Sequence, residues 1–429
     1  MDVRPGYKLT EVGVIPKEWE ALPAREIGVF KGGSGFPLTA QGGKSGAYPF
    51  FKVSDMNHEG NETFMTTANH YISEQTRKRL GATVTPADSI VFAKVGAAVF
   101  LERKKILGQP SCIDNNMAAY VLDRTRADVR YVHSLMLTKK LGALVATTAL
   151  PALNGKQLGE MALALPPLPE QRAIAAALSD VDAMLGGLHR LIAKKRDLKQ
   201  AAMQQLLTGQ TRLSGFHGEW EVKRLGEIGS TYGGLTGKSK ADFGVGTGQY
   251  VTFMNVMTNV VIDCGLFDQV RVSPTESQNR VSQGDLLFNG SSETPEEVAI
   301  CSLMAENVPN LFLNSFCFGF RIREKQEADG LFLAYYLRAS PGRDLMKSLA
   351  QGSTRYNLSK GALLEASVRL PRKAEQAAIA TVLADMDAEL SALDARLAKT
   401  RALKQAMMQE LLTGRTRLVR PEDEGAVAC

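Results

Sequence analysis

Two segments of the chain, residues 170–213 and 375–418, carry apolar residues at alternating steps of four and three. The spacing continues for about three heptads in each segment, as it does in coiled coils. We therefore predict two long helices that pair with each other. The predicted seam consists of Ile174, Leu178, Val181, Leu185, Leu188 and Ile192 in the first helix, and of Ile379, Leu383, Met386, Leu390, Leu393 and Leu397 in the second. The alternative is that each helix packs only on its own domain.

The ends of both segments carry helix signals. Glu and Gln occupy the first turn, where a carboxylate suits the positive end of the helix dipole. Neither copy contains an internal proline, and both end at a Thr-Gly pair that is typical of a glycine C-cap, Thr208-Gly209 and Thr413-Gly414. Prolines precede both copies and predict sharp helix starts. We place the two long helices within residues 166–213 and 371–418.

The rest of the chain also occurs twice. Trp19-Glu20 and Trp220-Glu221 open matching stretches, each followed by a glycine-rich region and by runs of aromatic and β-branched residues. These runs predict strands at 48–55, 86–96 and 116–122, and at 250–255, 283–291 and 314–322. Amphipathic helices are predicted at 131–144 and 331–349. The expected fold is α/β: two mixed α/β domains, residues 1–165 and 214–370, joined by two long helices in an internal pseudo-two-fold repeat, with a C-terminal tail at 419–429.

Composition narrows the class of protein. The chain has 429 residues, a formal charge of +6, five cysteines without a CxxC pair and five scattered histidines. We expect a cytoplasmic protein with reduced thiols, no metal site and no membrane span, because no apolar run approaches the ~20 residues that a span needs. The mild positive charge permits nucleic-acid binding without requiring it.

Catalytic motifs are not evident in the sequence. Gly237-Lys238-Ser239 resembles the end of a phosphate-binding loop, but Tyr232 stands where that motif needs glycine. A nucleotide hydrolase built on this loop is therefore a remote alternative. We expect a binding protein without catalytic residues of its own.

Several loops offer side chains that could contact nucleic acid. Lysine and serine beside the glycines could approach phosphates, and so could a short basic cluster, while Asn, Arg and Lys at strand ends can make two-point contacts with bases. The alternatives are ordinary turn chemistry and a solvated charged face. The candidates are Lys31, Ser34, Arg77, Lys78, Arg79, Lys94, Asn115, Asn116, Asn154 and Lys156 in the first half, and Lys238, Lys240, Asn289, Ser291, Thr354, Arg355, Tyr356, Asn357 and Lys360 in the second.

The order domain, helix, domain, helix resembles the specificity subunit of type I restriction-modification systems. The resemblance rests on Pro166-Pro167-Leu168-Pro169-Glu170-Gln171, on Leu206-Leu207-Thr208-Gly209 and on their second copies, Glu375-Gln376 and Leu411-Leu412-Thr413-Gly414. The second copy departs from the motif at Arg372-Lys373-Ala374.

The resemblance implies that each domain reads one half of a divided double-stranded DNA target. It also implies that the two long helices pair antiparallel and act as a spacer between the halves. It further implies two adenine-methylating partner subunits that bind S-adenosylmethionine, and optionally two ATP- and Mg-dependent restriction subunits, with no cofactor on this chain. A specificity subunit of a methylation-only or phage-defence system, and a coiled-coil scaffold that binds only proteins, remain open.

The C-terminal part of each long helix leaves the heptad pattern yet keeps the longest identical runs. We interpret this part as a surface for the methylating partners, with candidates Lys199, Gln200, Met203, Lys404, Gln405 and Met408.

Overall fold

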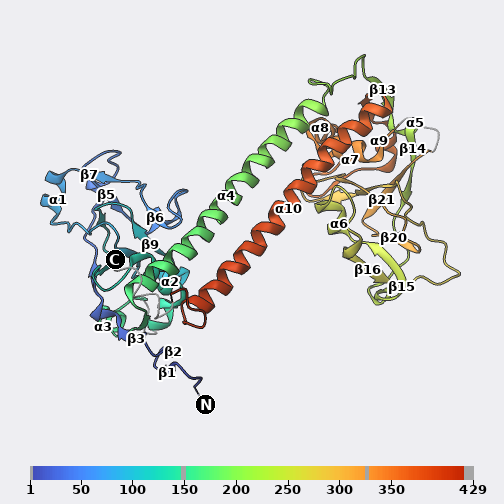
Figure 1. The fold of residues 1–429 in the computed structure, drawn as a ribbon. Coiled ribbons are helices and arrows are strands. Elements are labelled where there is room, and N and C mark those ends of the chain that lie inside the picture. Colours follow the sequence, from blue (N-terminus) through green and yellow to red (C-terminus); the bar gives the residue numbers. More distant parts are fainter. Residues whose placement is uncertain (1–2, 146–150, 324–327, 420–429) are drawn as a thin grey trace. The chain divides into compact units, whose positions relative to one another are not determined.

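The computed structural model describes residues 3–145, 151–323 and 328–419, which form two compact units (Figure 1). The first unit comprises residues 1–188 and 396–429, and the second comprises residues 189–395. Each unit thus contains one globular domain, the N-terminal part of one long helix and the C-terminal part of the other. Among the described residues, no helix is long and apolar enough to cross a membrane.

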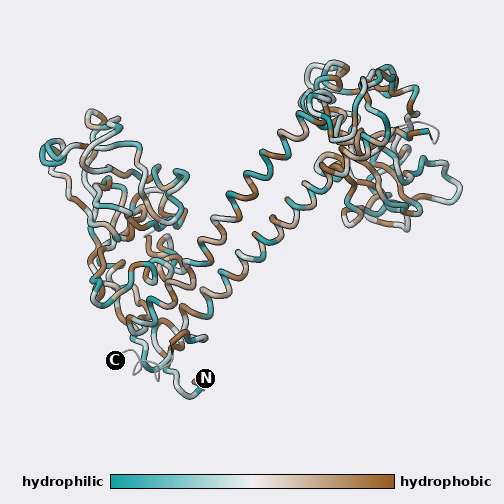
Figure 2. Tube along the Cα trace, turned by 45° about the horizontal axis from the view of Figure 1, so that its top comes forward, coloured by the Kyte–Doolittle hydropathy of each residue, from teal (hydrophilic) through white to brown (hydrophobic). Residues whose placement is uncertain are grey.

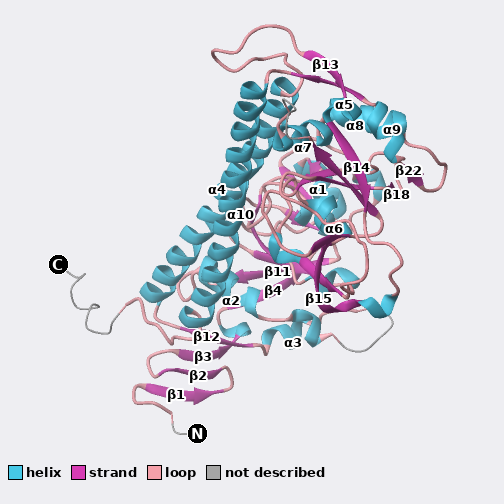
Figure 3. Cartoon of the chain, turned by 90° about the vertical axis from the view of Figure 1, so that its right-hand side faces the viewer, coloured by secondary structure: helices cyan, strands magenta, loops and turns pink. Residues whose placement is uncertain are grey.

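The first unit is built on one five-stranded sheet and one three-stranded sheet. The larger has the order β4 (Gly28–Gly32), β11 (Met117–Leu122), β8 (Ile90–Ala93), β9 (Lys104–Leu107) and β6 (Phe64–Met65), and the smaller has the order β10 (Cys112–Ile113), β5 (Tyr48–Phe51) and β7 (Tyr71–Ile72). Two antiparallel ribbons complete the strands, β1 (Tyr7–Thr10) with β2 (Gly13–Pro16), and β3 (Glu20–Pro23) with β12 (Ala162–Leu165) (Figure 3). The short helices are α1 (Glu74–Leu80), α2 (Val129–Thr138) and α3 (Gly155–Gly159).

The second unit repeats this plan. Its main sheet has the order β14 (Gly229–Gly233), β21 (Cys317–Ile322), β17 (Leu286–Asn289) and β19 (Cys301–Leu303), and its smaller sheet has the order β16 (Phe267–Val270), β15 (Phe243–Val251) and β20 (Leu311–Leu313). The ribbons are β13 (Glu221–Arg224) with β23 (Ser367–Leu370), and β18 (Ser291–Ser292) with β22 (Tyr356–Asn357). The short helices are α5 (Leu225–Ile228), α6 (Phe253–Thr258), α7 (Gly330–Arg338), α8 (Ser340–Leu349) and α9 (Lys360–Glu365).

Strand register shows that the two domains share one framework. Gly32 pairs with Ala118 in the first unit as Gly233 pairs with Phe318 in the second. Central strands β8 and β17 are antiparallel to β11 and β21, and the smaller sheets contain equivalent parallel pairs, β10 with β5 and β20 with β15. The predicted α/β repeat is thereby confirmed.

The long helices, α4 (Leu168–Leu206) and α10 (Lys373–Leu411), pair antiparallel within each unit. In the first unit Lys404 contacts Asp182, and in the second Lys199 contacts Asp387. All members of the predicted seam are buried or half-buried, as the heptad spacing requires. Apolar residues gather in each domain core and alternate with polar ones along both helices (Figure 2).

Helix ends complete each domain core. Trp19 packs with Ile174 and Leu178 at the start of α4 and with Leu411 and Leu412 at the end of α10. The second core combines Trp220 with the end of α4 and the start of α10 in the same way. Gly209 and Gly414 adopt φ values of +72° and +68°, as the predicted glycine caps require. A Cβ on either glycine would press against Trp220 or Trp19.

The Glu-Gln pair that opens each long helix ties the helix to its domain. Gln171 Oε1 accepts a hydrogen bond from the Asp128 amide (2.8 Å), and its Nε2 donates to the Pro166 carbonyl (2.9 Å). Gln376 makes the same two bonds with Asp329 and Pro371. The motif that carries the family resemblance is therefore architectural.

Several predicted elements differ from those observed. The strand predicted at 48–55 ends at Phe51, because the Asp55 carboxylate accepts a hydrogen bond from the Lys52 amide (2.6 Å) and starts a 3₁₀ helix at residue 53. The strand predicted at 250–255 likewise ends at residue 251, where Thr252 caps α6.

The predicted amphipathic helices are also shorter than expected. The helix expected at 331–349 is divided at Ala339 into α7 and α8, because Pro341 in the first turn of α8 has no amide hydrogen to continue the first helix. The helix predicted at 131–144 corresponds to α2, which ends at Thr138, followed by a 3₁₀ turn at Leu141–Leu144.

Candidate nucleic-acid interface

Three segments meet at equivalent places in the two domains and gather most of the candidate side chains. In the first domain, the Lys94 amide donates to the Asn116 carbonyl, and the Leu153 amide donates to the Lys94 carbonyl, both at 2.8 Å. In the second domain, Gly290 makes the same two bonds, with Phe316 (2.8 Å) and Leu358 (3.1 Å). We call these sites the first edge, which comprises Lys94, Asn115, Asn116, Asn154 and Lys156, and the second edge, which comprises Ser291, Thr354, Arg355, Tyr356, Asn357 and Lys360.

The first edge combines free and structural side chains. Asn154 caps α3, since its Oδ1 accepts from the Lys156 amide (2.8 Å), and Asn116 Nδ2 donates to Asp114 Oδ2 (3.3 Å). Asn115 and the Lys156 side chain are exposed. Hydrogen bonds thus fix the backbone of the first edge, while its exposed amide and ammonium groups stay accessible to a ligand.

The second edge projects a hairpin. Gln351 and Asn357 exchange backbone hydrogen bonds at 2.9 and 2.8 Å, which leaves Thr354 and Arg355 exposed at the tip. The Arg355 guanidinium lies 6.0 Å from the ring centroid of Phe316, whose side chain is 59% exposed. An exposed ring beside an arginine can contact bases by stacking. The sequence did not single out Phe316, because its place in an apolar strand pattern is also that of a core residue.

Asn289 does not face the second edge. Its side chain is fully buried, its Oδ1 accepts from the Ile300 amide (2.6 Å), and its Nδ2 donates to the Glu297 carbonyl (2.9 Å). These bonds hold the loop after β18, so the structure gives this candidate a supporting role.

Two glycines of the glycine-rich regions lie so close to a neighbouring backbone segment that no side chain would fit. A Cβ on Gly33 would lie 1.9 Å from the Asp114 carbonyl oxygen, and one on Gly234 would lie 2.1 Å from the Asn314 oxygen. The Ser34 hydroxyl accepts from the Thr83 amide at 3.0 Å, while Lys31 is exposed. Steric need thus explains these glycines without a bound phosphate.

Lys238 is engaged internally, unlike the exposed Lys240. Its ammonium bonds to Glu276 and to the Arg271 carbonyl (2.6 Å), and Gly237 before it has φ +65° in a turn. The remote nucleotide-loop alternative therefore has no free ammonium at this position.

The basic cluster on α1 likewise contains one side chain that is held within the domain, Arg77, and two that are exposed, Lys78 and Arg79. Arg77 donates to Glu74 at 2.7 and 2.8 Å and to the Ala82 carbonyl at 2.8 Å. Hydrogen bonding to Glu74 raises the pKa of Arg77. Lys78, whose ammonium lies 3.8 Å from Glu74, and Arg79 are exposed, so both stay candidates for phosphate contact.

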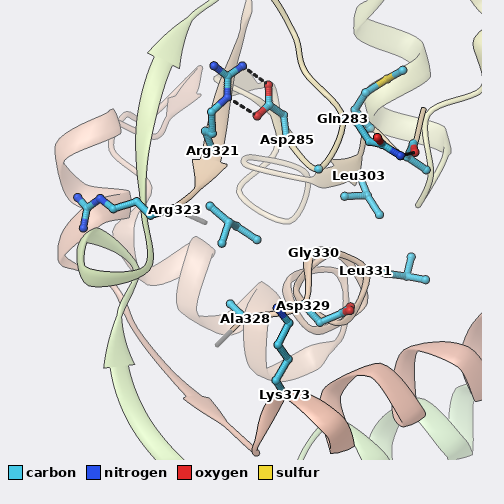
Figure 4. Close-up of a pocket in the computed structure, with 14 residues that line it drawn as sticks. Gln283, Asp285, Leu303, Arg321, Arg323, Ala328, Asp329, Gly330, Leu331 and Lys373 are labelled. Carbon is cyan, nitrogen blue, oxygen red and sulfur yellow. Dashed lines mark hydrogen bonds and ion pairs between the residues drawn. The ribbon is translucent and has the colours of Figure 1, made fainter. Parts of the chain in front are cut away.

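A pocket of about 410 Å³ lies beside the end of β21 and the start of α7 (Figure 4). Arg321 grips the buried Asp285 with two hydrogen bonds (2.8 and 2.7 Å), and the Tyr232 hydroxyl donates to the same carboxylate (2.6 Å). Burial, with Asp285 nearby, raises the pKa of Tyr232 well above its usual value, so the hydroxyl remains a donor. The ion pair of Arg321 with Asp285 in the wall of this pocket therefore supports the sheet, and both carboxylate oxygens of Asp285 accept hydrogen bonds.

The six partner-surface candidates fall into two groups. Lys199 and Lys404 form ion pairs between the two long helices, with Asp387 and Asp182. Gln200 and Gln405 are exposed, while Met203 and Met408 are half-buried. The ion pairs explain how the helices stay paired where the apolar seam ends.

Comparison with known proteins places the chain in a family. The model of the type I restriction modification DNA specificity domain matches residues 16–195 and 217–399. The putative type I restriction enzyme MjaX specificity subunit of Methanocaldococcus jannaschii is 22% identical over 445 residues, which cover 96% of this chain and 97% of that protein. The MjaVIII specificity subunit of the same organism is 23% identical over 338 residues, 75% of this chain and 76% of that protein.

Solved structures have the same fold. The S subunit of a type I restriction-modification system from M. genitalium superposes with a TM-score of 0.57 at 16% identity, over 95% of this chain and 98% of that one. The HsdS subunit from Thermoanaerobacter tengcongensis gives a TM-score of 0.51 at 18% identity, over 94% and 98% of the two chains.

Proposed function

The chain belongs to the type I restriction-modification DNA specificity family, and we propose that each of its two domains reads one half of a divided DNA target. The observation that carries this proposal is the pair of edges. Both edges stand on the same backbone hydrogen bonds, yet they display different side chains. The first has only asparagines and lysines, whereas the second adds Ser291, Thr354, Arg355 and Tyr356, with the exposed ring of Phe316 beside Arg355. One framework with two different polar surfaces suits two half-sites of different sequence.

The chain acts in this proposal as the recognition subunit of a larger enzyme. Two methyltransferase subunits bind it and supply S-adenosylmethionine for N6-adenine methylation. Restriction subunits, which use ATP and Mg, join where the system includes them. The repeated helix ends support two equivalent partner positions, because Trp19 and Trp220 pack against them in the same way.

The test is to map N6-methyladenine in a host that carries this chain with its methyltransferase subunit. We expect methylation at a sequence with two defined halves and an undefined spacer. Replacing residues 214–370 with the matching segment of a relative should change one half and leave the other. A change in both halves, or a purified complex that does not retain DNA, would contradict the proposal; the second result would favour a scaffold that binds only proteins.

A further inference from the structure

Gly32 and Gly233 end the equivalent strands β4 and β14, and an ammonium group lies over each of them. A Cβ placed on Gly32 would lie 2.9 Å from Lys94 Nζ, and a Cβ placed on Gly233 would lie 3.4 Å from Lys360 Nζ. In both cases, apart from the glycine and its two chain neighbours, no other atom of the described residues comes within 4 Å of that position. The two domains thus hold a positive charge at the same point of the framework.

The two lysines come from different elements. Lys94 follows β8, and its equivalent in the second domain is Gly290, as the backbone bonds to Asn116 and Phe316 show. Lys360 opens α9, one residue after the cap Ser359, and its equivalent is Gly155, one residue after the cap Asn154. Lysine and glycine have therefore exchanged places between the domains, while the ammonium stays over the same strand end.

Among the described residues, neither ammonium group makes a contact that stabilises the folded chain. Within residues 3–145, 151–323 and 328–419, no hydrogen bond or ion pair occupies the Nζ of Lys94 or Lys360. Lys238 behaves differently, since Glu276 neutralises it. A charge that is kept in place by two different routes and left unpaired is available to a ligand.

We propose that Lys94 and Lys360 bind equivalent phosphodiester groups of the DNA, one at each half-site. This rests on the proposed function. The other side chains of the two edges differ, so they suit different bases, whereas the sugar-phosphate backbone is the same at any half-site. A shared cation fits a shared ligand, and a lysine ammonium acts on a phosphate as a point charge.

The test uses the purified complex with its methyltransferase subunit and measures binding to target and non-target duplexes over a salt series. Lys94→Ala should weaken both by a similar factor and make the slope of log K against log salt shallower by about 0.9. Lys360→Ala should do the same. Lys17→Ala, which removes an exposed lysine from the loop after β2, is the matched control and should leave the slope unchanged.

The decisive variant moves the charge to the route that the other domain uses. At Gly155 no described atom beyond its chain neighbours and the backbone of its own helix lies within 4 Å of the position that a Cβ would take, so Gly155→Lys fits. Gly290→Lys would instead meet the Phe316 carbonyl oxygen at 3.1 Å. Lys94→Ala combined with Gly155→Lys should restore affinity and slope, which also shows that the Lys94→Ala protein is folded. Failure of this rescue, an unchanged slope in Lys94→Ala, or a changed methylated sequence in either alanine variant would overturn the inference. Absence of binding by the wild-type complex would instead count against the proposed function.

Discussion

The indole Nε1 of Trp19 donates a 3.0 Å hydrogen bond to Oε2 of Glu170, at the start of the first long helix. Both side chains are buried, and Arg417 completes the contacts of the carboxylate. At the equivalent place, Arg212 grips Glu375, but Trp220 Nε1 has no acceptor among the described residues. The two junctions between helix and domain therefore have the same plan and unequal hydrogen bonding.

This inequality predicts unequal effects of one substitution. Trp19→Phe removes a hydrogen bond to a carboxylate and should destabilise the first unit by about 1.5–3 kcal/mol more than the loss of ring volume alone. Trp220→Phe removes a buried donor that has no partner, so the second unit should lose less. Hydrogen exchange read by mass spectrometry, with peptides from each unit compared at one pH, checks this. Equal losses in the two variants would show that the Trp19 bond contributes nothing net.

The interhelical ion pairs allow the partner-surface hypothesis to be separated from helix pairing. Lys404→Asp places a second carboxylate against Asp182 and should destabilise the first unit by about 1 kcal/mol, since the pair is only half-buried. Exchanging the pair, Asp182→Lys with Lys404→Asp, should restore stability. Trp19 is the only tryptophan left after Trp220→Phe, so fluorescence in that background reports unfolding of the first unit.

Assembly with the methyltransferase subunit is then measured on the same variants. If Lys404 serves only helix pairing, the exchanged pair should assemble as the wild type does. An exchanged pair that is stable yet does not assemble would support Lys404 as a partner contact, and the same comparison applies to Lys199 with Asp387.

His133 on α2 predicts a pH dependence of the first unit. Burial lowers the pKa of His133 below 6.5, while the hydrogen bond of its Nε2 with the Lys104 carbonyl (2.9 Å) acts in the opposite direction. The folded protein thus binds fewer protons at this ring than the unfolded chain does. The stabilisation is complete above pH 6.5 and declines as the pH falls from 6.5 toward the lower pKa of the folded state.

The measurement is denaturant unfolding between about pH 5 and pH 8, followed by Trp19 fluorescence in the Trp220→Phe background. His133→Gln should flatten the decline relative to the parent. Burial also lowers the pKa of His70, so part of the decline should persist in the variant. Identical slopes for variant and parent would mean that His133 does not titrate in this range.

The antiparallel pairing predicts how the spacer can be lengthened. One heptad inserted after Gly187 of α4 and one after Ala398 of α10 preserve the seam and the ion pairs on both sides. Seven residues add about 10 Å of helix, which corresponds to about 3 base pairs. Methylome mapping should show the undefined spacer of the target lengthened by about that amount, with both halves kept. A heptad in α4 alone breaks the pairing register and serves as the control. An unchanged spacer length in the target of a folded double insertion would contradict the idea that the helices set the distance between the two halves.

The sequence by itself determined the two long helices, their seam and the repeat. Heptad spacing, the Thr-Gly caps and the Glu-Gln starts are local signals, because the residues that make them lie within a few turns of one another. The α/β class followed from the repeated strand and helix patterns of the two domains, whereas the antiparallel pairing was implied by the family resemblance. Element ends were predicted less well at Asp55, which ends a strand, and at Pro341, which divides a helix, because a single side chain decides each.

Only the tertiary structure decided which candidate side chains remain free. Lys238 and Lys94 were both predicted from the sequence to contact DNA. In the structure, Glu276 from another loop forms an ion pair with Lys238, whereas no described residue neutralises Lys94. Asn289 ends a strand as an edge residue would, but its loop folds back over it. The meeting of Lys94 with Gly32 and of Lys360 with Gly233 depends on strand register across distant segments. Hydrogen bonds and ion pairs between such segments form only when the chain is folded, so no local pattern encodes them.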